Sequence, residues 1–275
     1  MAQSRSLTAV VLACISLMPA AAYGQTEPAP AAPPVALAPA PTEALTPTAA
    51  PPVSAPMPRL SALFRPLGQD FRRIAAGRNL ALIGVGAGSA MASHALDARV
   101  SARPWGIGMM EESLEPGRFV GDFMIQTGGA FATYAVGRLT GKPRVATIGA
   151  ELFRAQIVAQ GTTQLLKVST RRTRPDGTRL SFPSGHTAAA FATASVLHAE
   201  LGWKVGVPAY ALAAWVGVSR MQADRHFVSD VIAGATVGLL AGRSVTFGHG
   251  NTRFALRPTA MPGGIGISIG RVSKN

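Results

Sequence analysis

The chain has 275 residues, of which 48% are hydrophobic and 14% charged, and its 26 Lys and Arg outnumber its 13 Asp and Glu to give a net charge of +13. A composition this apolar excludes an intrinsically disordered protein and is compatible with one large core or a membrane-associated bundle. The basic balance permits nucleic acid, an anionic membrane or a phosphorylated partner, and composition does not choose between them.

The N-terminal residues have the order of a secretory signal peptide. Arg5 precedes an apolar run over residues 7–18, and small residues follow it. We therefore expect residues 1–24 to be a signal peptide and the mature protein to be exported to the periplasm or cell envelope. The single cysteine, Cys14, lies inside this segment, and its lipidation is the alternative to plain cleavage near residue 24. Such cleavage leaves a chain without disulfides or cysteine-based metal sites.

A segment rich in Pro and Ala follows over residues 25–58. It contains 11 of the 21 prolines and no Lys or Arg, and its only charges are Glu27 and Glu43. Such a segment cannot bury a core, so we expect a disordered, extended linker. The positive charge of the chain therefore belongs to the domain that begins at Arg59.

From residue 59 to about residue 245, apolar and small residues recur at helical spacing between clusters of Gly, Pro and Arg. This periodicity predicts an all-α helical bundle over residues 59–245. The expected helices span residues 60–76, 80–96, 117–139, 145–168, 184–201, 205–220 and 226–243. Residues 79–96 lack Asp, Glu, Lys and Arg and are the best transmembrane candidate, although a buried helix with close small-residue packing explains them equally well.

Strand-like alternation appears only after these helices, in residues 246–275. Two short β-prone runs flank Pro262 and Gly263, which are typical turn residues. We therefore expect a short C-terminal tail that resembles a β-hairpin.

Three segments combine basic residues, histidines and carboxylates. They are KVSTRRTRP at residues 167–175, PSGH at residues 183–186 and SRMQADRHFVSD at residues 219–230. Taken singly, each has an ordinary explanation: a solvated helix end, a helix N-cap, and a structural His and Asp pair one turn apart. Their combination is what points to chemistry.

The three segments together supply the groups that hold an anion. Lys167, Arg174 and Arg220 are three cations, and the Arg guanidinium binds phosphate oxygens through paired hydrogen bonds. The backbone N–H groups of Ser184 and Gly185, at the start of an expected helix, form an anion cradle.

Two histidines accompany these groups. His226 has Asp230 one helical turn later, and His186 follows the Ser-Gly pair. One histidine as nucleophile and the other as acid is the equipment for phosphoryl transfer through a covalent intermediate.

The three segments resemble the tripartite signature of the type 2 phosphatidic acid phosphatase family. Its superfamily also includes bacterial non-specific acid phosphatases and vanadium-dependent haloperoxidases. Every position that the signature fixes is present: Lys167, Arg174, Pro175, Pro183, Ser184, Gly185, His186, Ser219, Arg220, His226 and Asp230. One departure is the short gap between Pro175 and Pro183, which leaves little room for a substrate-gating loop.

The resemblance implies a role for each site residue. His226 would attack phosphorus and become a phosphohistidine, and Asp230 would orient its ring. His186 would protonate the leaving oxygen and later activate water. The residues that would hold the phosphate oxygens are Lys167, Arg174, Ser184, Gly185 and Arg220. The resemblance implies no metal and no other cofactor, and vanadate is expected to act as an inhibitor or phosphate mimic.

Together with the expected signal peptide, the resemblance implies an exported, metal-independent phosphatase that hydrolyses phosphate monoesters, with lipid phosphates or isoprenyl pyrophosphate as further options. A vanadate-dependent haloperoxidase is the alternative enzyme, because bound vanadate mimics pentacoordinate phosphate. A basic, non-catalytic protein that binds anionic envelope polymers is the alternative without chemistry. The expected partners are phosphorylated small molecules or lipids and a membrane surface. We expect no nucleic acid, because the basic residues are not interleaved with aromatic ones.

Other basic residues have less to distinguish them. Several arginines flank the three segments and either extend the positive field or are merely solvated: Arg171, Arg172, Arg179 and Arg225. The remaining histidines are interpreted as packing or surface residues: His94, His198 and His249.

Overall fold

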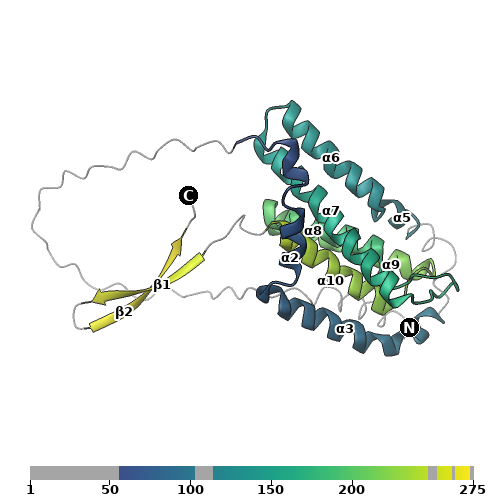
Figure 1. Ribbon diagram of the computed structural model, residues 1–275. Coiled ribbons are helices and arrows are strands. Elements are labelled where there is room, and N and C mark those ends of the chain that lie inside the picture. Colours follow the sequence, from purple (N-terminus) through teal and green to yellow (C-terminus); the bar gives the residue numbers. More distant parts are fainter. Residues whose placement is uncertain (1–55, 103–113, 247–252, 262–263, 273–275) are drawn as a thin grey trace, which may run out of the picture. The chain divides into compact units, whose positions relative to one another are not determined.

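Figure 1 shows a computed structural model of the chain, which describes residues 56–102, 114–246, 253–261 and 264–272. The signal peptide expected over residues 1–24 and nearly all of the expected linker lie outside the described residues. Both therefore stay predictions.

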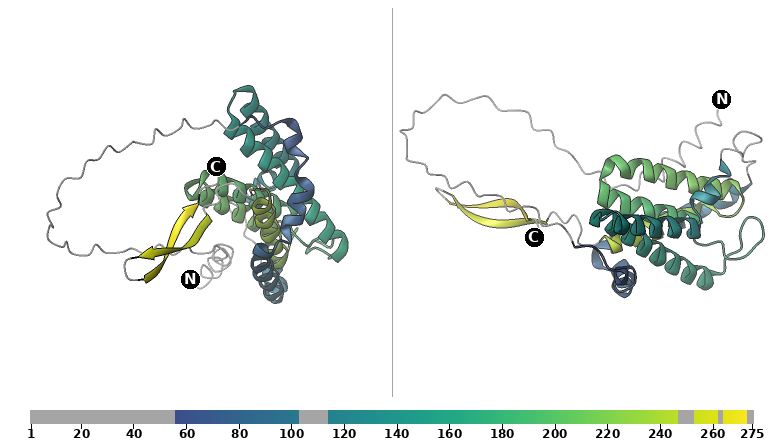
Figure 2. Two further views of the ribbon diagram at one scale, coloured as in Figure 1. Left: turned by 60° about the vertical axis from the view of Figure 1, so that its left-hand side comes forward. Right: turned by 90° about the horizontal axis from the view of Figure 1, so that it is seen from above.

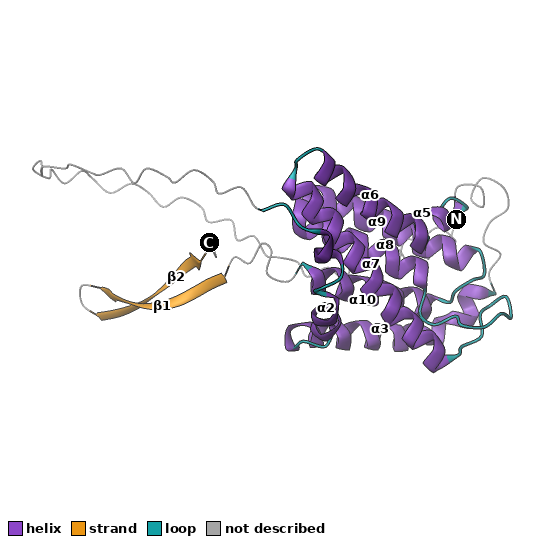
Figure 3. Cartoon of the chain, turned by 45° about the horizontal axis from the view of Figure 1, so that its top comes forward, coloured by secondary structure: helices purple, strands orange, loops and turns teal. Residues whose placement is uncertain are grey.

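The described chain up to residue 246 is built from helices (Figure 3). In chain order they are η1 (Leu60–Leu63), α2 (Leu67–Ile74), α3 (Gly77–Ser101), α5 (Gly117–Val120), α6 (Phe123–Leu139), α7 (Pro143–Thr170), α8 (Gly185–Leu201), α9 (Trp203–Gln222) and α10 (Val228–Val245). Helices α7, α8 and α10 pack against one another at the centre, while α6 covers α7, α9 covers α8, and α3 covers α10. The predicted helical bundle is confirmed.

Two of the predicted helices are each divided. The helix expected over residues 60–76 becomes η1 and α2, because Pro66 between them lacks an N–H and disfavours a helical residue before it. The helix expected over residues 117–139 becomes α5 and α6. Asp122 has an extended backbone there, and its carboxylate accepts a hydrogen bond from the Met124 N–H at 2.8 Å, which starts a new helix.

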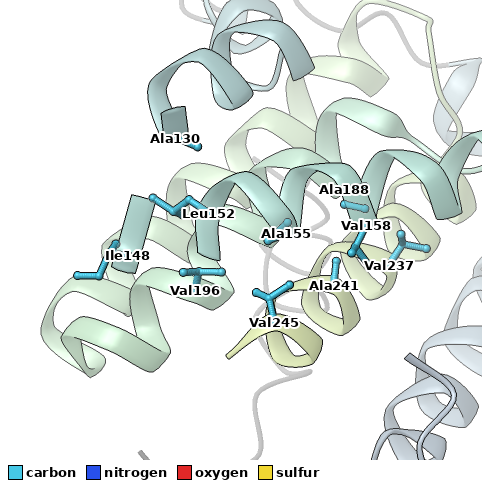
Figure 4. Packing of buried hydrophobic residues seen from close by; sticks show 12 residues of the cluster. Ala130, Ile148, Leu152, Ala155, Val158, Ala188, Val196, Val237, Ala241 and Val245 are labelled. Atoms are coloured by element: carbon cyan, nitrogen blue, oxygen red, sulfur yellow. The ribbon is translucent and has the colours of Figure 1, made fainter. Parts of the chain in front are cut away.

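The core between the central helices consists largely of Ala and Val (Figure 4). Val158 of α7, Val196 of α8 and Val245 of α10 are at most 1% exposed. Full burial of a side chain of this size contributes roughly 1.5–3 kcal/mol. Small side chains here allow the three helices to approach one another closely.

Helices α8 and α10 approach closely at glycines of α10, two of which lie against backbone carbonyl oxygens. A Cβ atom at Gly234 would overlap the carbonyl oxygen of Ser184, and one at Gly238 would overlap that of Ala188. Only glycine fits at these two contacts. The absence of a side chain at these glycines therefore sets the distance between the start of α8 and the start of α10. Two of the signature segments lie at these helix starts.

Among the described residues, α10 alone combines the length and hydropathy of a membrane span, and 83% of that helix is buried inside the bundle. Residues 79–96, the candidate taken from the sequence, form part of α3 and do not meet the same criterion. The several Gly, Ser, Asn and His residues of that stretch lower its hydropathy.

The C-terminal tail contains two antiparallel strands, β1 (Arg253–Met261) and β2 (Gly264–Val272). Arg253 pairs with Val272 at one end of this ladder and Met261 pairs with Gly264 at the other. Figure 2 shows the strands as a twisted two-stranded ribbon, the form that isolated strand pairs adopt. Their pairing follows the alternation of the sequence.

Candidate active site

The signature segments lie where α7 ends, α8 begins, α9 ends and α10 begins. Two backbone hydrogen bonds join the connections between these helices. The Asp176 N–H donates to the carbonyl oxygen of Asp224 at 3.2 Å, and the Ser184 N–H donates to that of Asp230 at 2.9 Å. The fold thus brings residues from three separate stretches of the chain to one end of the bundle.

A cavity of about 1160 Å³ lies at this end. Both signature histidines, His186 and His226, line it together with Arg174 and Arg220. Each of the three segments therefore contributes to a single cavity. Residues of α5 and of the segments on either side of it complete the wall, among them Arg118, Glu115 and Asp122.

Two guanidinium groups in this cavity lack an anionic partner. The Nε atoms of Arg174 and Arg220 are buried and make no hydrogen bond, and within the described residues neither side chain has a carboxylate at ion-pair distance. Burial, followed by the charge of Arg225, lowers the pKa of Arg220 to about 10. Arg220 is buried and Arg174 is half-buried, and although carboxylates also line the cavity, none of those described is at ion-pair distance. A buried cation without a partner is costly, so this arrangement favours an anionic ligand.

Lys167 lies beside the cavity and not in its described lining. Its buried Nζ donates to the carbonyl oxygens of Leu180 at 2.6 Å and Ser181 at 3.3 Å. Burial, and then the charge of Arg174, lowers the Lys167 pKa to about 8. The ammonium group therefore holds the loop that leads into α8.

Ser184 is engaged within the fold. It is the N-cap of α8, and its hydroxyl accepts hydrogen bonds from the Thr187 N–H at 3.4 Å and the Thr187 hydroxyl at 2.8 Å. Because its own N–H donates to Asp230, that N–H is not free to bind an anion, which differs from the expected cradle. The Gly185 N–H belongs to the first turn of α8, where N–H groups have no partner within the helix.

His226 and Asp230 are not on one helix as the sequence led us to expect. His226 precedes α10, Phe227 is the N-cap, and Asp230 lies in the first turn. The Asp230 carboxylate accepts the Phe227 N–H at 2.9 Å, which caps the helix and leaves His226 outside it.

The side chains of His226 and Asp230 nevertheless face each other. The Nδ1 atom of His226 lies 3.6 Å from Oδ2 of Asp230, slightly beyond hydrogen-bond distance. His226 is 4% exposed, and burial lowers its pKa to about 4 despite the opposing effect of Asp230. The imidazole is therefore neutral near pH 7.

Both oxygens of the Asp230 carboxylate are held. Oδ1 accepts from Arg172 Nη1 at 2.8 Å, and Oδ2 accepts from the Ser181 hydroxyl and the Phe227 N–H. Burial alone would raise the pKa of Asp230, but His226 and these hydrogen-bond donors outweigh burial and lower it. The carboxylate is therefore ionised and fixed in orientation.

His186 is the second residue of α8, and it lines the same cavity as His226. Burial, followed by the charges of Arg220 and His226, lowers its pKa to about 4. A Cβ atom at Gly121 would meet that of His186 at 2.9 Å, so the glycine before α6 makes room for this histidine.

Sequence reasoning missed three residues that hold Asp230 in place. Ser181 and Arg172 contact its carboxylate directly, and Asp97 of α3 contacts Arg172. In the sequence, nothing distinguishes Arg172 from the other arginines that flank the signature segments. His94, interpreted as a packing or surface residue, lies with Nδ1 2.9 Å from Asp97 Oδ2. No local sequence signal connects α3 with the signature, because that contact is made only in the folded chain.

The fold is a helical bundle that brings the three signature segments to one cavity. A family model described as "PAP2 superfamily" matches residues 176–253, which hold the second and third segments. Over these residues the chain is similar to this superfamily, that of the type 2 phosphatidic acid phosphatases.

Curated relatives match over part of their length. A lipid A 1-phosphatase of Porphyromonas gingivalis is 49% identical over 80 residues, covering 28% of this chain and 18% of the relative. A lipid A 4'-phosphatase of Helicobacter pylori is 31% identical over 99 residues, covering 32% of this chain and 50% of the relative. The chain thus spans half or less of these two proteins.

Two solved structures are also similar. The crystal structure of Aquifex aeolicus LpxE is 22% identical with a TM-score of 0.46, covering 56% of this chain and 95% of that one. A transmembrane PAP2-type phosphatidylglycerolphosphate phosphatase from Bacillus subtilis is 24% identical with a TM-score of 0.38, covering 67% of this chain and 92% of that one.

Proposed function

We propose that this protein is an exported phosphatase that hydrolyses lipid phosphates and other phosphate monoesters through a phosphohistidine at His226. One observation carries the proposal. Buried His226 and half-buried His186 share a cavity with Arg174 and Arg220, two guanidinium groups that form no ion pair within the described residues. A phosphate group bound between them would satisfy both cations.

In the first step, Nε2 of His226 attacks phosphorus. A tautomer with the proton on Nδ1, facing the Asp230 carboxylate, leaves the Nε2 lone pair free. The N–P bond forms as the bond from phosphorus to the leaving oxygen breaks. Asp230 stabilises the positive charge that develops on the ring, as a carboxylate does beside a catalytic imidazole.

His186 supplies the proton to the leaving oxygen. In the free protein burial, and after it the Arg220 charge, lowers its pKa to about 4 and leaves it neutral near pH 7. A bound phosphate dianion offsets that charge and raises the His186 pKa in the complex. The histidine thereby becomes an acid only when substrate is present.

In the second step, water hydrolyses the phosphohistidine. Neutral His186 takes a proton from the water, whose oxygen attacks phosphorus while the P–N bond breaks. Inorganic phosphate leaves, and both histidines return to their starting states. Arg174 and Arg220 hold the non-bridging oxygens in both steps, and the Gly185 N–H is placed to assist them.

A lipid phosphate is the substrate class that the relatives favour. The relatives from Porphyromonas gingivalis and Helicobacter pylori are lipid A phosphatases. A probable diacylglycerol pyrophosphate phosphatase of Schizosaccharomyces pombe is 42% identical over 77 residues. Export rests on the expected signal peptide. The described residues contain no group of three His, Cys, Asp or Glu suited to a metal, and we propose catalysis without one.

The direct test is turnover by the purified protein in the presence of a chelator. The panel comprises phosphatidate, phosphatidylglycerol phosphate, isoprenyl pyrophosphate and p-nitrophenyl phosphate. His226→Ala and His186→Ala should each lower kcat by at least about 1000-fold, since the groups act as a unit. Wild-type activity in His226→Ala would refute the mechanism. Oxidation of halide in the presence of vanadate and peroxide would favour the haloperoxidase. Salt-sensitive adsorption to anionic polymers without any turnover would favour the envelope-binding protein.

A further inference from the structure

Arg172, in the loop after α7, joins two carboxylates that come from different helices. Its Nη1 donates to Asp230 Oδ1 at 2.8 Å, and its Nη2 donates to Asp97 Oδ2 at 2.7 Å. The carboxylates are nearly inaccessible, with Asp97 at 5% and Asp230 at 0% side-chain exposure. One guanidinium therefore bridges α3 to the residue that faces His226.

Asp97 is itself firmly held. Its carboxylate accepts the Ser229 N–H at 3.0 Å and the Ser229 hydroxyl at 2.6 Å, and it lies 2.9 Å from His94 Nδ1. These contacts tie α3 to the first turn of α10, next to Asp230. Asp97 is thus a fixed anchor for the Arg172 side chain.

Arg172 also contacts the turn that carries His226. Its Nη1 donates to the Ser229 hydroxyl at 2.7 Å, and its guanidinium lies 4.3 Å from the centre of the Phe227 ring, within the range of a cation–π contact. The same side chain therefore contacts Phe227, Ser229 and Asp230, and so restrains the segment that directly follows His226.

We infer that Arg172 and Asp97 are positioning residues for catalysis, an inference that rests on the proposed function. Arg172 holds Asp230 Oδ1, so that Oδ2 is directed at His226 Nδ1 and the imidazole is kept in line for attack. Asp97 holds Arg172. An ammonium group could not replace the guanidinium, because a planar fork reaches two carboxylates at once and a point charge does not.

The surroundings of Arg172 argue against a role in binding substrate. Two carboxylates already balance its charge, and it is absent from the described lining of the catalytic cavity. It instead borders a separate cavity of about 510 Å³ together with His94 and Ser229. Its loss should therefore affect kcat and leave KM nearly unchanged.

The test compares Arg172→Gln with Arg171→Gln, kinetically and by thermal unfolding. Arg171 is the exposed neighbour, and its Nε donates only to the Val168 carbonyl oxygen among the described residues. With a soluble monoester, Arg172→Gln should lower kcat by about 100-fold, because a small misplacement of a reacting group has that effect. Its KM should change less than about twofold, and Arg171→Gln should keep wild-type kcat.

A double-mutant cycle separates positioning from general destabilisation. If Arg172 acts through Asp230, then Arg172→Gln in the Asp230→Asn background should change the residual kcat by less than about threefold. Multiplication of the two single effects would overturn the inference. So would equal kcat values for Arg172→Gln and Arg171→Gln.

Two further variants decide the matter if Arg172→Gln does not fold. Arg172→Lys keeps the charge, and Asp97→Asn keeps the shape; each should fold and lower kcat at least about tenfold. Wild-type kcat in both would overturn the inference. An inactive wild-type protein, or an active His226→Ala variant, would instead refute the proposed function, so the two failures are distinguishable.

Discussion

Arg174 and Arg220 each have a buried Nε atom that makes no hydrogen bond in the described part of the chain. A buried charge destabilises a protein unless it is paired, and within the described residues neither buried Arg220 nor half-buried Arg174 forms an ion pair. A phosphate oxyanion would supply the missing partner. The cost in stability should therefore be recovered when an anion binds.

Inorganic phosphate and vanadate should raise the melting temperature of the purified protein. At a concentration of 100 times Kd, a ligand that binds only the folded state stabilises it by about 2.7 kcal/mol. Thermal unfolding at increasing anion concentration measures this effect, and vanadate should also inhibit turnover. Arg220→Gln should remove the shift without lowering the melting temperature of the free protein. An unchanged shift in that variant would contradict the assignment.

Lys167 should set the basic limit of activity. Its pKa of about 8, lowered by burial, means that the ammonium is charged below pH 8 and loses its proton above it. The neutral amine no longer offsets the bound phosphate charge, so kcat/KM should fall as pH rises through this value. Lys167→Arg keeps its positive charge at higher pH, so the fall in kcat/KM should move to higher pH in this variant. An identical pH profile in Lys167→Arg would exclude this role.

At the level of the elements, the contact between α8 and α10 fixes the distance between the two histidine segments. Gly234 lies against the carbonyl oxygen of Ser184, so a methyl group there must separate the helices. Overpacking of this kind costs about 1–3 kcal/mol. Gly234→Ala should therefore lower both the melting temperature and kcat.

Gly88 of α3 is the matched control, because a Cβ atom there meets nothing within 4 Å. Gly88→Ala should stabilise the protein by up to about 1 kcal/mol through helix propensity, with unchanged kcat. Equal effects of the two substitutions on melting temperature would show that the close approach of α8 and α10 is unimportant.

The periodicity of apolar residues predicts the helices well, because their burial repeats with the helical turn. It cannot reveal local breaks: Pro66 and Asp122 each divide a predicted helix by their own backbone chemistry. The signature segments likewise predict which residues meet in the cavity. They do not predict that the Ser184 N–H is used by Asp230, or that Asp97 reaches Arg172, because both contacts depend on tertiary packing.

Over the whole described molecule, apolar side chains remain exposed on the outer helices. On α6, Met124 is 73%, Phe131 46% and Leu139 87% exposed. Their spacing of seven and eight residues, about two turns, places them on one side of the helix. Exposed apolar patches commonly mark contact surfaces, and the lipid substrate proposed above would make a membrane surface the natural partner.

The double variant Met124→Ser, Leu139→Ser should bind phospholipid vesicles at least about tenfold more weakly, because two large apolar side chains no longer enter the membrane. Its turnover of p-nitrophenyl phosphate should stay at the wild-type level. Vesicle co-sedimentation at two salt concentrations separates this contact from charge attraction, which salt screens. Unchanged vesicle binding would contradict a membrane contact through α6.

The measurement that tests the account most directly is detection of the phosphorylated histidine. His186→Ala, mixed with p-nitrophenyl phosphate and rapidly quenched at neutral pH, should accumulate the intermediate, because this leaving group needs little protonation while water still lacks its base. Mass spectrometry should then locate one phosphoryl group on His226. Turnover by the wild-type protein with no phosphoryl group on His226, or with the group on another residue, would contradict the account.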